Sequence, residues 1–266
     1  MPDLERLVPL RTGGHLPPVF CVHAVSGSAY AYAGLARLLG DDRPVHGFEA
    51  PGFDNDRTPV GSLTALADEY TDILRAAHPD GTYLLLGWSL GGLVAFEMAK
   101  RLTQAGDVVD LLVLVDAGLP RVMDLPPERD ILVRFVRDMA GTSGESPAGL
   151  DELAAAWAPD VAPGAVFEEV ERAGVLPEEF DSHLLGEQYA VFRAHLKAFY
   201  SIEVTGSHPG PAVHVLAEAS PAQDMRWQRF LPDLVEHTVP HSTHHSIWTG
   251  DSLLELSRLV REHLGH

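Results

Sequence analysis

Residues 83–98 read YLLLGWSLGGLVAFEM and place a Gly-x-Ser-x-Gly pattern at Gly87–Gly91. The apolar run at its start predicts a strand of the kind that is covered on both faces in a parallel sheet. After the pattern, apolar residues recur at helical spacing and stop before Gly106, which predicts a helix. Glycines on both sides of Ser89 leave room for a sharp turn that lifts a serine hydroxyl off the end of a sheet. Ser89 is therefore a candidate nucleophile.

The chain on either side of this turn alternates between strand-like and helix-like segments. Further strands are predicted at 18–23, 44–48, 108–115, 212–216 and 235–239, after a polar lead-in that ends at 13–14. Further helices are predicted at 32–39, at 63–74 with Ser62 as cap, and at 253–264 with Asp251 as cap. The alternation predicts the fold class α/β, with a mostly parallel central sheet and helices on both faces. With the serine turn, this is the α/β-hydrolase arrangement.

One long stretch departs from the alternation. From about 119 to 204 the pattern is helical alone, with helices expected at 131–139, 153–157 and 178–200 and prolines between them. An all-helical stretch inside a βα chain is expected as an insertion over one end of the sheet, where a lid would lie. We therefore expect a single domain over residues 1–266, with a helical lid insertion at about 119–204.

Composition narrows the classes of partner. The chain has 266 residues, and 19 Lys and Arg against 38 Asp and Glu give it a formal net charge of −19. Such a charge repels phosphate backbones and anionic bilayers, which argues against nucleic acid and membranes as partners. The start lacks the features of a signal peptide, and no apolar run has the length of a membrane span, so a cytoplasmic location is expected.

Cysteine and histidine usage suggests neither a disulfide nor a metal. Cys21 is the only cysteine and lies in an apolar run, so it is expected as a buried thiol. The histidines at 241, 244 and 245 have no accompanying cysteine pair or spaced carboxylate and do not match H-E-x-x-H. We expect no metal site and no bound cofactor.

A serine nucleophile needs a base, and the base needs an acid that holds it. In the α/β-hydrolase order, the acid and then the histidine follow the serine. His241, His244 and His245 all lie between the last predicted strand and the last predicted helix. For the acid, Asp116 follows the strand after the serine turn and Asp224 follows the next strand. The residues alone give no reason to prefer one of these two acids as the partner of the histidine.

The negative oxygen of an acyl-transfer intermediate needs two backbone N–H donors. One comes from the residue after the nucleophile, which is Leu90, and the other from an earlier strand-to-helix loop. That second donor is expected in the loop 24–27, where small residues let the backbone face the site.

Four segments together resemble the C-terminal thioesterase domains of nonribosomal peptide synthetases and hybrid polyketide assembly lines. They are PVFCVHAVSGS at 18–28, FEAPGF at 48–53, DGTYLLLGWSLGG at 80–92 and VAFEMA at 94–99. Trp88 discriminates most, because this branch tends to have Trp before the serine, whereas stand-alone editing thioesterases tend to have His. The resemblance covers nearly the whole chain.

The resemblance implies a choice among the candidates. The family places its acid after the strand that follows the serine helix, which implies Asp116. A family pattern of Gly-x-His aligns with His244, although Ser242 stands here for the usual glycine and His245 for a common aromatic. His245 is the next candidate and His241 the last.

For the second oxyanion donor the resemblance implies Val25, with Ala24 as its neighbour. It also implies a carrier protein as partner, which delivers an acyl or peptidyl chain as a thioester on its phosphopantetheine arm. Ser89 would take the chain as an acyl-enzyme, and release to water or to a group of the chain itself would give an acid or a macrocycle. Alternatives are a stand-alone editing thioesterase, an esterase with no carrier partner, and a binding module on an inactive hydrolase scaffold.

Overall fold

The computed structural model describes residues 2–53, 57–79, 81–141, 147–221 and 226–265. Within these ranges, seven strands form one sheet in the order β1-β3-β2-β4-β5-β6-β7. Neighbouring strands pair in parallel except β1 and β3, which are antiparallel. The strands are β1 (Leu7–Arg11), β2 (Val19–Val22), β3 (Val45–Phe48), β4 (Tyr83–Trp88), β5 (Val109–Val115), β6 (Ala212–Ala217) and β7 (Leu234–Val239). The predicted, mostly parallel sheet is confirmed.

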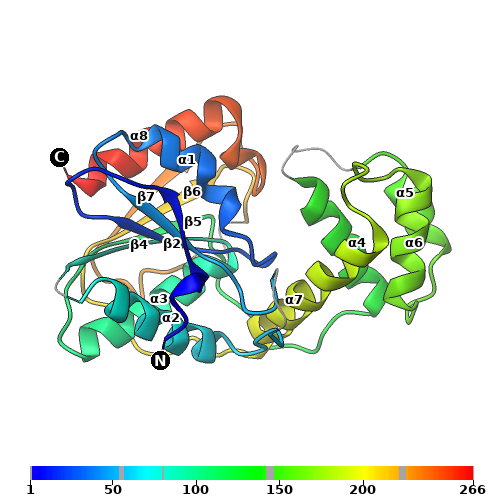
Figure 1. Ribbon diagram of the computed structural model, residues 1–266, viewed down its shortest axis with the longest axis horizontal. Helices are drawn as coiled ribbons and strands as arrows, with labels where there is room; N and C mark the ends of the chain where they lie inside the picture. The colour runs from blue at the N-terminus through cyan, green and yellow to red at the C-terminus, as the bar shows by residue number, and fades with distance from the viewer. Residues whose placement is uncertain (1, 54–56, 80, 142–146, 222–225, 266) are drawn as a thin grey trace.

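Helices cover both faces of this sheet (Figure 1). The helices α1 (Ala33–Leu38) and α8 (Gly250–Leu264) pack on one face, and α2 (Leu63–Ala77) and α3 (Leu90–Gln104) pack on the other. Side chains of β4 alternate between the two layers, with Leu84 and Leu86 in one apolar cluster and Leu85 in the other. Because both faces are buried, the strand reads as an unbroken apolar run. Short 3-10 turns lie at Leu4–Arg6, Ala29–Tyr32 and Ser246–Trp248.

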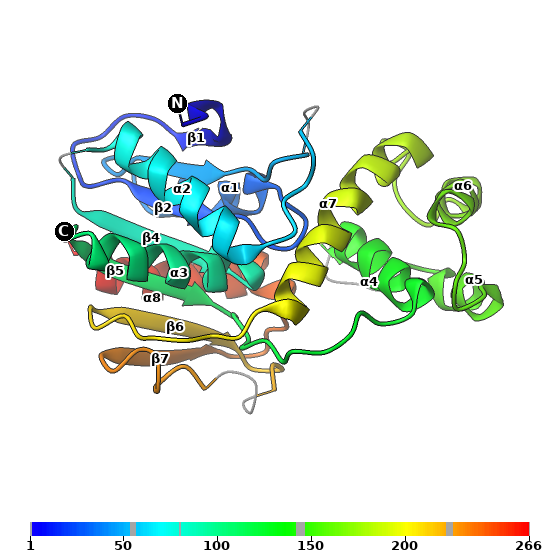
Figure 2. The ribbon, with the colours of Figure 1, turned by 90° about the horizontal axis from the view of Figure 1, so that it is seen from below.

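In the chain, the four remaining helices of the described residues come between β5 and β6. In space, they lie at one end of the sheet (Figures 1 and 2). They are α4 (Glu128–Ala140), α5 (Leu150–Ala156), α6 (Pro163–Ala173) and α7 (Ser182–Ser201), and we call residues 128–201 the helical segment. It has an apolar cluster of its own, in which Phe135 contacts Phe167, Tyr189 and Phe192 edge to face. Strand β6 then resumes the sheet.

Helix boundaries show where the sequence prediction was right and where it was wrong. Ser62 caps α2 as predicted, because its hydroxyl accepts a hydrogen bond from the Ala65 N–H at 3.3 Å. Asp251 was predicted as the cap of α8, but that helix begins at Gly250 and Asp251 lies in its first turn. There its carboxylate is close to the positive end of the helix dipole.

Two elements were absent from the prediction. The lead-in before Gly13 forms β1, an edge strand whose Pro9 fits there because an edge strand need not donate every N–H. The helix α6 starts at Pro163 itself, since proline is well suited to the first helical position. No helix in the described ranges has the length and apolar character needed to cross a membrane.

Candidate active site

Ser89 lies at the sharp turn between β4 and α3. Its backbone has φ 56° and ψ −125°, a strained conformation for a residue with a side chain. The glycines at 87 and 91 are required by space, because a Cβ at Gly87 would overlap the Gly91 backbone and one at Gly91 would overlap the Val22 carbonyl oxygen. The backbone thus takes the conformation that a nucleophile elbow needs.

Asp116 lies at the end of β5 and is hydrogen-bonded to His244. The distance from His244 Nδ1 to Asp116 Oδ2 is 2.6 Å. The same carboxylate accepts from the Ala217 N–H at 2.9 Å and from the Ser220 hydroxyl at 2.7 Å. Burial raises the pKa of Asp116, but the bonds from His244, Ala217 and Ser220 outweigh it and leave the pKa below its ordinary value. The acid is therefore ionised at neutral pH.

The other two histidines of this loop have different partners. His241 is exposed, and its ring lies 3.6 Å from Glu218. The ring of His245 bonds Asp138 of α4, with 3.1 Å between Nε2 and Oδ1. Of the three histidines, the structure brings His244 to Asp116. Asp224, the other candidate acid, lies outside the described residues.

Ser89, Asp116 and His244 line one hollow of about 390 Å³. Phe199 and Tyr200, at the end of α7, form part of its wall. The rest of the lining comes from the chain after β5, from α4 and from the loop after β6: Gly118, Leu119, Arg121, Met123, Arg134, Ser220 and Pro221. The serine and the acid–histidine pair therefore line the same hollow as residues of the helical segment.

Trp88, the residue before the serine, packs against the histidine loop. Its ring centroid lies 5.1 Å from that of His244 and 5.8 Å from that of His245. It also lies 5.5 Å from the ring of Trp248. The large side chain thus supports the face of His244.

The two expected oxyanion donors lie near Ser89 in the fold. Leu90 is the first residue of α3, so its N–H has no acceptor within the helix. Val25 lies in the loop after β2, and we call residues 24–28 the Val25 loop. The Gly91 backbone contacts the end of β2, because a Cβ at Gly91 would meet the carbonyl oxygens of Val22 and His23. This contact brings the start of the Val25 loop to the serine turn.

Sequence reasoning missed two buried histidines beside this loop. His23 follows β2 and was treated as the end of a strand, and His195 lies on α7 in an ordinary helical pattern. Each ring bonds a carbonyl of the Val25 loop. The position of His23 next to the loop was a usable signal, whereas nothing in the local sequence marks His195.

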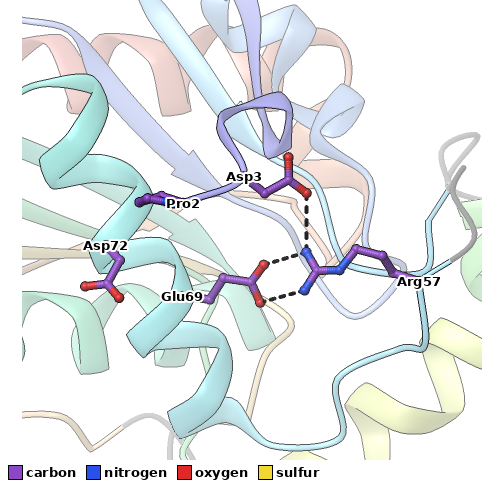
Figure 3. Close-up of a pocket in the computed structure, with 5 residues that line it drawn as sticks. All are labelled: Pro2, Asp3, Arg57, Glu69 and Asp72. Carbon is purple, nitrogen blue, oxygen red and sulfur yellow. Dashed lines mark hydrogen bonds and ion pairs between the residues drawn. The ribbon is translucent and has the colours of Figure 1, made fainter.

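Another hollow, of about 540 Å³, lies beside α2 and near the N-terminus (Figure 3). In it, Arg57 bonds Glu69 at 2.6 Å and Asp3 at 3.4 Å. Its lining consists of Pro2, Asp3, Arg57, Glu69 and Asp72, which offer no nucleophile and base pair. Among the residues that the structure describes, no three His, Cys, Asp or Glu side chains come close enough to hold a metal ion.

Comparison with known proteins gives the family. The model of the thioesterase domain matches residues 17–156, which is more than half of the chain. This chain belongs to the thioesterase family. It is accordingly a hydrolase by fold and family, and the expected resemblance is confirmed.

The chain is also similar in sequence to parts of much longer proteins. It is 39% identical over 137 residues to a dimodular nonribosomal peptide synthase of Bacillus subtilis, which covers 50% of this chain and 6% of that protein. It is 36% identical over 147 residues to malpibaldin synthetase of Mortierella alpina, covering 52% of this chain and 3% of that protein. The chain therefore spans only a small fraction of these relatives.

Solved structures agree on the fold. The thioesterase domain NocB from the nocardicin cluster superposes with a TM-score of 0.65 at 24% identity, covering 96% of each chain. A four-domain nonribosomal peptide synthetase superposes with a TM-score of 0.83 at 24% identity, over 97% of this chain and 20% of that one. The predicted α/β-hydrolase fold is thus confirmed for the thioesterase.

Proposed function

We propose that the chain is a serine thioesterase that releases an acyl or peptidyl chain from the phosphopantetheine arm of a carrier protein in secondary-metabolite biosynthesis. The observation that carries the proposal is the 2.6 Å bond between His244 and Asp116 in the hollow that Ser89 also lines. Membership of the thioesterase family and similarity to parts of nonribosomal peptide synthetases support this substrate class. No cofactor is needed, because the phosphopantetheine belongs to the carrier.

The first half-reaction forms an acyl-enzyme. Ser89 Oγ attacks the thioester carbonyl carbon while its proton passes to Nε2 of His244. Asp116 accepts the Nδ1 hydrogen bond, which holds the ring and stabilises the imidazolium. The tetrahedral intermediate then breaks its C–S bond, and the leaving thiol takes the proton from His244. The products are free pantetheine thiol and an ester on Ser89.

The negative oxygen of the intermediate would lie between the N–H groups of Leu90 and Val25. Backbone donors of this kind are fixed before the reaction and act in a site with little water, which makes them effective. The start of α3 adds the positive end of a helix dipole on the Leu90 side. Two donors on opposite sides would stabilise the developing charge.

The second half-reaction releases the chain from Ser89. His244 takes a proton from water, or from an amine or hydroxyl of the bound chain, and that nucleophile attacks the ester carbonyl. Water gives a free acid and the internal group gives a macrocycle, and in both cases the proton returns to the Ser89 oxygen. We propose that the helical segment acts as a lid that restricts water, because Phe199 and Tyr200 of this segment line the hollow beside Ser89.

The test compares Ser89→Ala with wild type. We expect Ser89→Ala to lose fluorophosphonate labelling and all release of peptidyl pantetheine thioesters, because it removes the hydroxyl that would form the acyl-enzyme. Ser207→Ala, at an exposed serine, is the matched control and should keep both. Labelling at any residue other than Ser89, or retained turnover in Ser89→Ala, would overturn the mechanism.

Product analysis by mass separates the substrate classes. Release of long peptidyl chains, as an acid or a ring, supports the proposal. A preference for short acyl groups on a carrier protein would indicate an editing thioesterase instead. Rapid turnover of simple esters with no gain from the pantetheine arm would indicate a carrier-independent esterase.

A further inference from the structure

Two histidines outside the proposed triad lie behind the Val25 loop. His23 follows β2 and His195 comes from α7, and both side chains are fully buried. Their rings stack, with centroids 5.0 Å apart and an angle of 12° between the planes. A residue of the helical segment thus packs directly on the loop that carries a proposed oxyanion donor.

Each ring holds one carbonyl of this loop. His23 Nδ1 lies 2.7 Å from the Ala24 oxygen, and His195 Nδ1 lies 2.9 Å from the Val25 oxygen. A carbonyl oxygen can only accept, so both Nδ1 atoms must carry a proton. Burial lowers the pKa of His23 to about 3 and that of His195 to about 4, so both rings are neutral at pH 7.

The Nε2 atoms of the two rings differ in their hydrogen-bond partners. His23 Nε2 lies 2.6 Å from the hydroxyl of Tyr70, which can donate to it. His195 Nε2 is buried and has no partner among the described protein groups. A buried unpaired nitrogen costs free energy, and an apolar ring of similar size would avoid that cost. What histidine supplies at position 195 that phenylalanine would not is the Nδ1–H donor to Val25.

Peptide geometry connects these bonds to the oxyanion donor. The Ala24 carbonyl and the Val25 N–H belong to one peptide group, and in a trans peptide they point in opposite directions. A bond that fixes the Ala24 carbonyl therefore also aims the Val25 N–H. The bond from His195 fixes the next peptide group, so both groups flanking the Val25 Cα are held.

The helix α7 contacts the loop at a second point. Gly27 has φ +91°, and a Cβ there would lie 2.8 Å from Val191 and 2.9 Å from Ala50. In its last turn the same helix carries Phe199 and Tyr200, which line the hollow beside Ser89. One rigid element thus forms part of the acyl-binding wall and supports the Val25 loop.

We propose that His195 is a positioning residue for the oxyanion hole: it bonds the Val25 carbonyl and stacks on His23, and thereby directs the Val25 N–H at the negative oxygen. This inference rests on the proposed function, since it requires a tetrahedral intermediate at Ser89. It also implies that a displacement of α7 weakens the oxyanion hole directly.

Two variants separate the ring from its donor. His195→Phe keeps a stacking ring without the donor, and His195→Asn places an amide N–H where Nδ1 lies. With a small pantetheine thioester, we expect His195→Phe to lose about 100-fold in kcat with little change in KM, as for a misplaced oxyanion donor. His195→Asn should recover most of the loss. Affinity for a boronic acid that forms a tetrahedral adduct with Ser89 should fall in parallel with kcat.

Controls separate this inference from the proposed function. Lys197→Ala changes an exposed side chain on the same helix and should leave kcat unchanged. Ser89→Ala tests the mechanism itself: activity retained there refutes the proposed function, whereas activity lost there but kept in His195→Phe refutes only the role of His195. Equal kcat in His195→Phe and His195→Asn, or a loss confined to KM, would also refute that role.

A measurement on the wild-type chain tests the same bond without depending on whether a variant folds. Nitrogen-15 NMR of the histidine rings should find His195 neutral at pH 6 with its proton on Nδ1. A neutral ring with its proton on Nε2 would leave no donor for the Val25 carbonyl and would overturn the proposal.

Discussion

The carboxylate of Asp116 orients the ring of His244, the proposed base. Its two oxygens accept three hydrogen bonds, from His244, Ala217 and Ser220. Only the bond from His244 bears on the tautomer of the base, since it requires the ring proton on Nδ1 and leaves Nε2 free to accept. The other two bonds hold the carboxylate in place for that purpose.

Replacement of this acid should act on catalysis. We expect Asp116→Asn to reduce kcat by about ten-thousandfold, the loss known when a triad acid becomes an amide and the histidine tautomer is wrong. Asp110→Asn, at an exposed position of the same strand, is the control and should change kcat by less than about twofold. Steady-state kinetics with one thioester would check both. A larger loss for Asp224→Asn than for Asp116→Asn would contradict the assignment.

At the scale of residues, the prediction of Ser89 depends on a local signal in the sequence. The Gly-x-Ser-x-Gly pattern marks Ser89 within five residues, and the strained backbone there agrees with it. The choice of Asp116 and His244 needed the family resemblance, because contacts between residues far apart in the chain leave no local pattern. His195 was missed for the same reason, since its partner is a carbonyl 170 residues earlier in the chain.

At the scale of elements, the junction of β4 and α3 depends on close approach of backbones. Gly91 lies against the Val22 carbonyl oxygen, where no Cβ fits, and a rigid backbone cannot move aside as a flexible side chain can. Gly186 lies inside α7 and has nothing within 4 Å of its Cβ position. The two glycines are both helical and differ only in their surroundings.

This difference predicts opposite changes in stability. Gly91→Ala should lower the free energy of unfolding by about 3 kcal/mol or more, because strand and helix must separate. Gly186→Ala should raise it by up to about 1 kcal/mol, the difference in helix propensity. Urea unfolding followed by circular dichroism would measure both. An equal effect of the two substitutions would show that the junction is not tightly packed.

Elements were predictable where burial leaves a clear pattern, which is an unbroken apolar run in the core strands and a helical period in α2 and α3. Prediction failed at α6, because Pro163 reads as a break in sequence and yet begins the helix. It also failed at β1, where Pro9 interrupts the apolar residues Leu7, Val8 and Leu10 and is tolerated at an edge position. Both failures concern proline, whose effect depends on its position in an element.

The helical segment is joined to the site at two separate loops. Asp138 of α4 bonds His245, next to the proposed base, and His195 of α7 bonds Val25. The chemistry of the site and the placement of these helices are therefore coupled. Such a coupling can be found only in three dimensions, since each bond joins residues more than 100 positions apart.

At the scale of the whole molecule, the core buries titratable groups that must remain neutral. His23, His195 and His214 have less than 2% of their surface exposed, and burial lowers their pKa values to about 3, about 4 and about 4. The ordinary pKa of histidine is about 6.5. Between these values the unfolded chain binds protons that the folded chain does not.

The stability of the fold should therefore fall as the pH falls from about 6.5 toward about 4. Near pH 5, these three histidines should take up about three protons from the solvent on unfolding, which corresponds to about 4 kcal/mol per pH unit. Above pH 6.5 these histidines no longer lower the free energy of unfolding, because there they are neutral in both the folded and the unfolded state. His214→Gln should reduce the uptake by about one proton, whereas His241→Gln, at an exposed ring, should leave it unchanged. Urea unfolding between pH 5 and 8 measures the slope, and a flat profile from pH 5 to 6.5 would mean that these rings are not held neutral by the core.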